Sequence, residues 1–73
     1  MNERLITIGI MTYNRKEIIT EHVNYLLKLN LPTFVNVLII DNNSSDGSYD
    51  AVRLLVEGNN NFIVAVDVGH EVP

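Results

Sequence analysis

The sequence contains no cysteine and no long apolar run. Without cysteine, a disulfide framework and a thiolate zinc site are both excluded. No apolar run approaches the roughly 18 residues that a membrane-spanning helix needs. The N-terminus has an acid and a base before a short apolar run and lacks a small-residue cleavage site, so we expect no secretory signal. These absences fit a cytoplasmic protein.

Positive charge is also scarce. Five lysines and arginines stand against nine acidic residues, which gives a formal net charge of −4. Proteins that bind nucleic acids usually carry a basic face, so we expect no nucleic-acid partner. All five basic residues precede Leu54, which places any anion site in the N-terminal part of the chain. With 73 residues, of which 47% are hydrophobic, the chain is at most one small globular domain.

The hydrophobic pattern predicts five elements in the order β-α-β-α-β. Apolar runs without alternation predict strands covered on both faces, as in a parallel sheet. Apolar residues at helical spacing predict two helices between them. The predicted strands are residues 4–11, 35–40 and 62–66, and the predicted helices are residues 15–29 and 49–56. With right-handed crossovers, this order gives a Rossmann-like α/β fold with three neighbouring parallel strands.

Each of the first two predicted strands ends in a polar cluster. Residues 12–14 (TYN) follow the first strand, and residues 41–47 (DNNSSDG) follow the second. Because all strands of a parallel sheet end at one edge, we expect the two clusters to meet there, beside two helix N-termini. Capping explains part of this composition, since Asn14 is placed to cap the first helix and Asp46 or Ser48 the second. The convergence of so many polar groups favours a small-molecule or nucleotide site.

The opening of family 2 glycosyltransferases, which are inverting enzymes with the GT-A fold, resembles two segments of this sequence: ITIGIMTYNRKEIITEHVNYLL and VNVLIIDNNSSDGSYDAV. The resemblance covers residues 4 to about 56. It implies the N-terminal half of a nucleotide-diphospho-sugar transferase, which binds the nucleotide of a sugar donor. In this family the donor is usually a uridine or thymidine diphosphate sugar, and the sugar passes to an acceptor hydroxyl.

The same resemblance implies a nucleotide site at the two polar clusters. Tyr13 would stack on or flank the base, beside Met11 and Thr12. Asp41 and Asn42 match an acidic pair with which many members bracket uracil. The second residue of the pair is an amide here, and it still accepts a hydrogen bond through its oxygen. Arg15 matches a frequent basic position and would reach a phosphate. Its alternative role is that of a solvated charge at the start of the helix. The residues so implied are Met11, Thr12, Tyr13, Arg15, Asp41 and Asn42.

For catalysis, the resemblance implies groups beyond the matched segment. The full-length enzyme would hold Mg²⁺ or Mn²⁺ through an Asp-x-Asp pair, which neutralises the diphosphate leaving group, and would use a further acid as general base. Asp67 is followed by Val68 and Gly69 rather than by a second acid. We therefore expect no catalytic residue and no metal ligand in this chain. It would be a single partial domain, inactive alone, in which residues 57–73 depart from the family.

Three functions stay open on the sequence. The first is the nucleotide-sugar-binding part of a glycosyltransferase. The resemblance is compatible with a peripheral membrane context for the full-length enzyme. The second is a non-catalytic α/β nucleotide-binding or interaction module. The third is a nucleotidyltransferase, which the lack of a glycine-rich phosphate loop disfavours. In each case both crossovers run the same way and put both helices on one face of the sheet. The other apolar face then invites self-association or the remainder of the domain.

Overall fold

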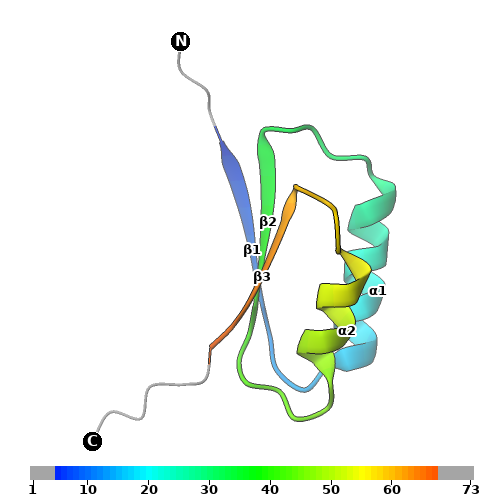
Figure 1. Ribbon diagram of the computed structural model, residues 1–73, viewed down its shortest axis with the longest axis vertical. Helices are drawn as coiled ribbons and strands as arrows, with labels where there is room; N and C mark the ends of the chain where they lie inside the picture. The colour runs from blue at the N-terminus through cyan, green and yellow to red at the C-terminus, as the bar shows by residue number, and fades with distance from the viewer. Residues whose placement is uncertain (1–4, 68–73) are drawn as a thin grey trace, which may run out of the picture.

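The computed structural model describes residues 5–67. Three parallel strands form one sheet in the order β1-β2-β3, with a helix in each connection (Figure 1). The elements are β1 (Ile6–Thr12), α1 (Lys16–Lys28), β2 (Val35–Asp41), α2 (Ser48–Leu55) and β3 (Phe62–Val66). The predicted fold class, element order and parallel pairing are confirmed. The predicted start of the first strand, residue 4, lies outside the described residues.

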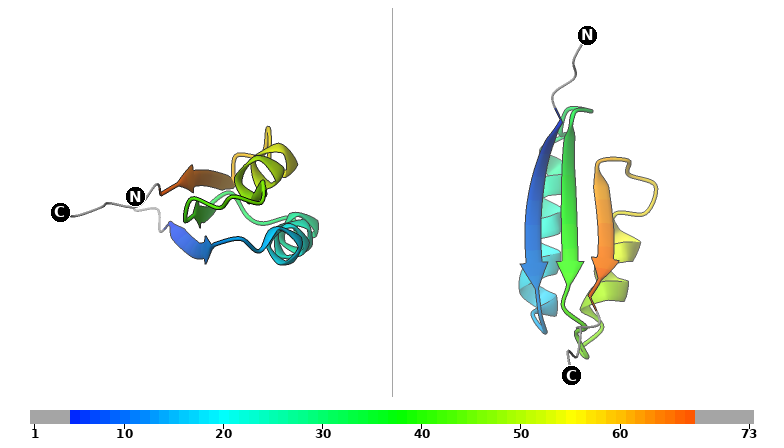
Figure 2. Two further views of the ribbon diagram at one scale, coloured as in Figure 1. Left: turned by 90° about the horizontal axis from the view of Figure 1, so that it is seen from below. Right: turned by 90° about the vertical axis from the view of Figure 1, so that its left-hand side faces the viewer.

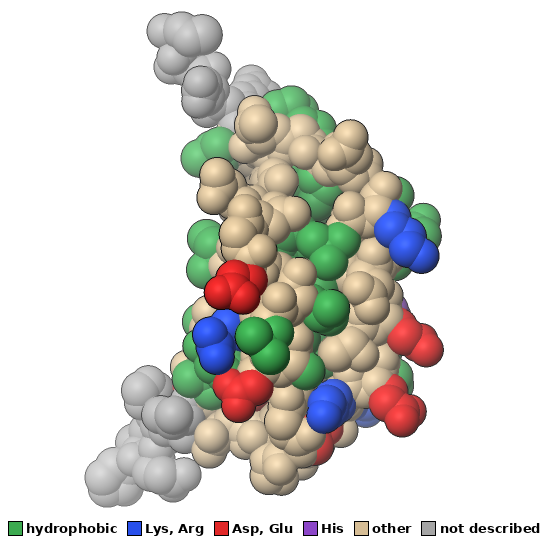
Figure 3. Space-filling model, turned by 45° about the vertical axis from the view of Figure 1, so that its right-hand side comes forward, with side chains coloured by type: hydrophobic (Ala, Val, Ile, Leu, Met, Phe, Trp, Pro, Cys, Tyr) green, Lys and Arg blue, Asp and Glu red, His purple; other side chains and the backbone are tan. Residues whose placement is uncertain are grey.

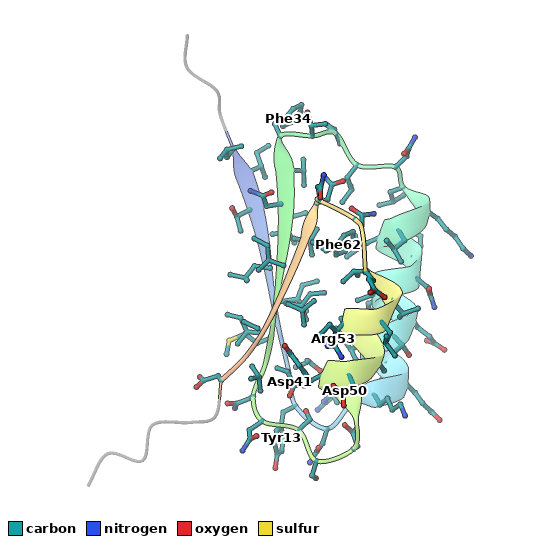
Figure 4. All side chains as sticks on the ribbon, viewed as in Figure 1. Tyr13, Phe34, Asp41, Asp50, Arg53 and Phe62 are labelled. Atoms are coloured by element: carbon teal, nitrogen blue, oxygen red, sulfur yellow. The ribbon has the colours of Figure 1, made fainter. Side chains whose placement is uncertain are left out.

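Both helices cover the same face of the sheet (Figure 2). β2 is the central strand, and its residues alternate between buried and half-buried along its whole length. Val37 and Ile39 of β2 are fully buried, against Val23 of α1 and Val52 of α2. Phe62 of β3 completes this core, which lies between the sheet and the two helices (Figure 4).

The opposite face of the sheet has no covering element among the described residues. The strand register aligns Gly9 with Leu38 and Ile63, and it aligns Met11 with Ile40 and Ala65. We call this surface the bare face; it comprises Gly9, Met11, Leu38, Ile40, Ile63 and Ala65. Met11 is 69% exposed and Ile63 is 52% exposed. The prediction that both crossovers put the helices on one face is therefore confirmed. The second cover that the apolar strands predict is not supplied by residues 5–67.

Charge follows the same division between the two sides. The three strands contain one charged residue, Asp41, and its side chain is on the helix-covered face. The other charged side chains of the described residues lie on the helices and loops, and Figure 3 shows several of them from the helix side. The six residues of the bare face are thus uncharged, and each is exposed or half-buried.

At the amino ends of the strands, one side chain ties two loops together. The Asn61 side-chain amide donates to the carbonyl oxygens of Pro32, at 2.8 Å, and Val35, at 2.7 Å. The loop before β2 is thereby fixed to the loop before β3. A different set of polar contacts joins the loops at the carboxyl ends of the strands, where the predicted site lies.

Candidate functional site

The two polar clusters meet at the carboxyl ends of β1 and β2. Thr12 and Asp41 are register partners at the ends of the two strands. One residue farther on, the Asn42 amide donates to the Thr12 carbonyl oxygen at 2.8 Å. The strands therefore deliver the β1–α1 loop and the β2–α2 loop side by side, as the sequence predicts for a parallel sheet.

A hollow of about 250 Å³ opens where these loops meet. Its lining consists of Met11, Thr12, Tyr13, Arg15 and Asn42, so the structure brings five of the six predicted nucleotide-binding residues to one pocket. Tyr13 is 55% exposed and lies at the end of the sheet (Figure 4), where its ring is accessible to a ligand. Arg15 also lines an adjoining hollow of about 420 Å³, beside the start of α1.

The sixth predicted residue, Asp41, does not line this pocket. It is 1% exposed, and Figure 4 shows it inward of Tyr13, between the sheet and the helices. One carboxylate oxygen, Oδ2, accepts from the Ser44 backbone amide at 2.7 Å, and the other, Oδ1, accepts from the Ser44 hydroxyl at 2.7 Å. Both oxygens of Asp41 thus bind the loop that follows β2.

Ser44 in turn contacts the other loop. Its Oγ accepts from the Asn14 backbone amide at 2.7 Å, while the Asn14 side-chain oxygen accepts from the Ser45 amide at 2.7 Å. The prediction that Asn14 caps the first helix is wrong: Arg15 is the N-cap residue, and Asn14 adopts a left-handed φ of 49°. This conformation, which asparagine tolerates better than most residues, directs its side chain to the second loop.

Asp46 contacts the first turns of both helices. Its Oδ2 accepts from the Lys16 amide at 3.1 Å, at the start of α1. Its Oδ1 accepts from the Ser48 amide at 3.0 Å and from the Ser48 hydroxyl, at the start of α2. The N-cap residue of α2 is Gly47, so the prediction that Asp46 or Ser48 occupies this position is wrong. Asp46 instead precedes the cap and accepts from the first amide of each helix, and its contact with α1 is an addition that sequence reasoning missed.

The contacts of Asp46 also set its acidity. The donated hydrogen bond from the Ser48 hydroxyl lowers the pKa of the Asp46 carboxyl below its usual value. Desolvation opposes this shift, and the amides of Lys16 and Ser48 reinforce it. Hydrogen bonds to the charged form of a carboxyl favour ionisation, so Asp46 is an anion at neutral pH.

The described residues do not fit a divalent metal. Among them, no group of three or more His, Cys, Asp or Glu side chains is placed to hold a metal ion. Asp41 and Asp46, in the second of the two loop segments, use their oxygens to accept from backbone amides and hydroxyls. Residues 5–67 also contain no helix that is long and apolar enough to cross a membrane.

Comparison with known proteins places these features in a family. The fold is similar to that of a mannosyltransferase from Pyrobaculum calidifontis, in complex with GDP-Man and Mn²⁺, with a TM-score of 0.77 and 21% sequence identity. That alignment covers 100% of this chain and 22% of the mannosyltransferase, so the chain spans about a fifth of its length. No curated protein matches the sequence. The family model of glycosyl transferase family 2 matches residues 7–68, which include β1 from its second residue onward, the other two strands and both helices, and the chain therefore belongs to this family.

Proposed function

We propose that this chain is the nucleotide-sugar-binding part of a glycosyltransferase, which transfers a sugar from a nucleotide-diphosphate donor to an acceptor hydroxyl. The observation that carries the proposal is the shared lining of one pocket by Tyr13, Arg15 and Asn42 at the carboxyl ends of β1 and β2. Ligands of open α/β sheets bind at this edge, and helix N-termini favour phosphate groups there. Family membership supports the same assignment.

Each of the three side chains suits a different part of a nucleotide. The exposed ring of Tyr13 offers a stacking surface to a base. The guanidinium of Arg15, at the N-cap of α1, offers charged donors to a phosphate. Asn42 is exposed, and its side-chain amide offers one acceptor and two donors to the edge of the base.

The amide of Asn42 is compatible with more than one base. Its oxygen can accept from the ring N–H of uracil or guanine, while its nitrogen donates to the neighbouring carbonyl oxygen of either base. The resemblance in sequence favours a uridine or thymidine diphosphate, whereas the similar mannosyltransferase holds GDP-Man. We therefore propose that the pocket accepts both uracil and guanine nucleotides.

Binding, rather than transfer, is the step that this chain supplies. In the full-length enzyme, Mg²⁺ or Mn²⁺ would neutralise the diphosphate leaving group, and the described residues do not supply its ligands. Affinity for a nucleotide should then depend little on the metal, and the chain alone should transfer no sugar. A non-catalytic nucleotide-binding module is the alternative, and it differs only in whether the protein continues into an Asp-x-Asp segment.

Calorimetric titration with UDP and GDP, with and without Mn²⁺, tests the proposal. We expect weak binding that Tyr13→Ala reduces by about 1–3 kcal/mol, the range for loss of one base–aromatic stack. Tyr25→Ala is the matched control, because Tyr25 is 63% exposed on α1 and does not line this pocket. An equal loss of affinity in both variants, strongly metal-dependent binding, or sugar transfer by the 73 residues would contradict the proposal.

A further inference from the structure

Asp41 ends the central strand at the site, yet it is closed off from the pocket. Its exposed fraction is 1%, and it is absent from the pocket lining to which its neighbour Asn42 contributes. A ribose hydroxyl or a base could reach its carboxylate only if the β2–α2 loop moved away. The two donors from Ser44 are charge-assisted, and hydrogen bonds of this kind are among the strongest in proteins.

Ser44 passes this constraint to the other loop. Its hydroxyl donates to Asp41 and accepts from the Asn14 amide, so both hydrogen-bonding roles of the hydroxyl are used. The Asn14 side chain returns a contact to the Ser45 amide. We call these four residues, Asp41, Ser44, Asn14 and Ser45, the loop clasp. They join positions 30 and 31 residues apart in the chain, on either side of the pocket.

The clasp lies immediately next to the residues that line the pocket. Asn14 is between Tyr13 and Arg15, and Asp41 directly precedes Asn42. Asn14 holds a left-handed φ of 49°, and Asn43, between Asn42 and Ser44 in the second loop, holds a φ of 61°. Such conformations are uncommon for residues with a side chain and need support from the surrounding contacts.

We propose that Asp41 is a positioning residue, which acts through Ser44 and Asn14 to hold Tyr13, Arg15 and Asn42 around one pocket, rather than a residue that touches the nucleotide. This inference rests on the proposed nucleotide-binding function and changes the role that family resemblance assigns to Asp41. Asn42 then binds the edge of the base, and the carboxylate of Asp41 holds Asn42 in position.

A double-mutant cycle between Asp41→Ala and Ser44→Ala separates the two roles. If Asp41 acts through Ser44, each single variant weakens UDP or GDP binding about tenfold, and the double variant is no weaker than either single one. If Asp41 contacts the nucleotide directly, Ser44→Ala leaves binding unchanged or tighter, because it frees a carboxylate oxygen. That second result would overturn the proposal.

Loss of stability alone must not explain the effect. Asn61→Ala is the control, because Asn61 also joins two loops through paired hydrogen bonds, but at the opposite end of the sheet. We expect this variant to unfold at lower urea concentration and to keep the affinity of the wild type. If Asn61→Ala weakens nucleotide binding as much as Ser44→Ala does, the clasp has no specific role in positioning the pocket.

Hydrogen exchange of the ligand-free protein tests the clasp without a nucleotide. In Ser44→Ala, the Asn14 amide should exchange faster, although it is 30 residues away, whereas amides of β2 should keep their protection. Should Asp41→Ala not fold, Ser44→Ala still carries this test, since Ser44 is only half-buried in a loop. Unchanged exchange at Asn14 would overturn the proposal even if the wild type binds nucleotides. Faster exchange would show that Ser44 joins the two loops even if the proposed function fails, so the two failures are distinguishable.

Discussion

β1 and β2 have similar sequences and very different surroundings. ITIGIMT and VNVLIID are both rich in β-branched residues, and both lead into the candidate site. Every second residue of β2 is buried, whereas Thr12 is the one buried residue of β1, and Ile6 is 50% exposed. β2 is paired on both sides beneath two helices, while β1 lies at the edge of the sheet (Figure 2).

The difference shows what an uninterrupted apolar run in a strand means. Such a run marks surface that is stable only when something covers it, and it does not identify what the cover is. In β2 the cover on one face is supplied by this chain. On the helix side of β1 the cover is partial, since Thr12 is buried and Ile10 packs against the core while Ile6 and Ile8 are exposed. On the bare face of all three strands, none of residues 5–67 supplies it.

The largest effect should come from comparing an isoleucine-to-alanine substitution on the helix side of β2 with one on the helix side of β1. Ile39→Ala removes a fully buried side chain of β2 and should cost about 2–5 kcal/mol, enough to unfold a domain of this size. Ile8→Ala, at a position of β1 that is 38% exposed, should cost about 1 kcal/mol or less. Urea unfolding followed by circular dichroism, at low protein concentration, measures both. Equal losses would mean that β1 is as well covered as β2.

The second prediction concerns what covers the bare face. Burial of apolar surface contributes about 25 cal/mol per Å², so we predict that the 73-residue chain associates with itself through this face. Ile63→Lys should weaken that association at least about tenfold, because a charge would have to be desolvated within an apolar contact. Sedimentation velocity over a range of concentrations measures the change.

A matched control uses a residue of similar exposure on the helix side. Leu54 is 62% exposed on α2, and Leu54→Lys should leave the association of the wild type unaltered. A wild type that stays monomeric at high concentration would contradict the prediction. So would an equal effect of the two lysine substitutions, because the association would then not depend on the bare face.

How far the sequence predicts this structure depends on the range over which each feature is set. The strands and helices follow from local hydrophobic spacing, and the crossover rule then fixes their parallel order and the single covered face. Convergence of the two polar clusters follows from that order alone. The resemblance to the family then singled out individual residues within these clusters, and five of them line one pocket: Met11, Thr12, Tyr13, Arg15 and Asn42.

The contacts inside the two loops were not predictable in the same way. Several acceptors stand close together in DNNSSDG, and spacing cannot decide which of them meets which donor across 30 residues of chain. Asn14 occupies a plausible capping position, but its left-handed backbone turns it toward Ser45. A signal for the Asp41–Ser44 contact was present, since aspartate commonly binds backbone amides a few residues later in a turn.

The smallest expected effect concerns the loops that follow β1 and β2. It tests whether the charge of Asp46, which contacts the first residues of α1 and α2, stabilises the folded chain. The pKa of Asp46 is lowered in the folded state, chiefly by the Ser48 hydroxyl. The ionised carboxylate therefore stabilises the fold at every pH above the ordinary pKa of an aspartate. That stability should be lost as the pH falls from about 4 through the lower folded-state pKa. The side chain introduced by Asp46→Asn carries no charge to lose in this pH range, so the difference in melting temperature between the wild type and this variant should shrink there.

Because the other acids titrate in both proteins, their contributions largely cancel in the difference. Thermal unfolding from about pH 6 to about pH 3 measures it. A difference that stays constant over this range would mean that the contacts of Asp46 with Lys16 and Ser48 do not stabilise the folded chain through its charge.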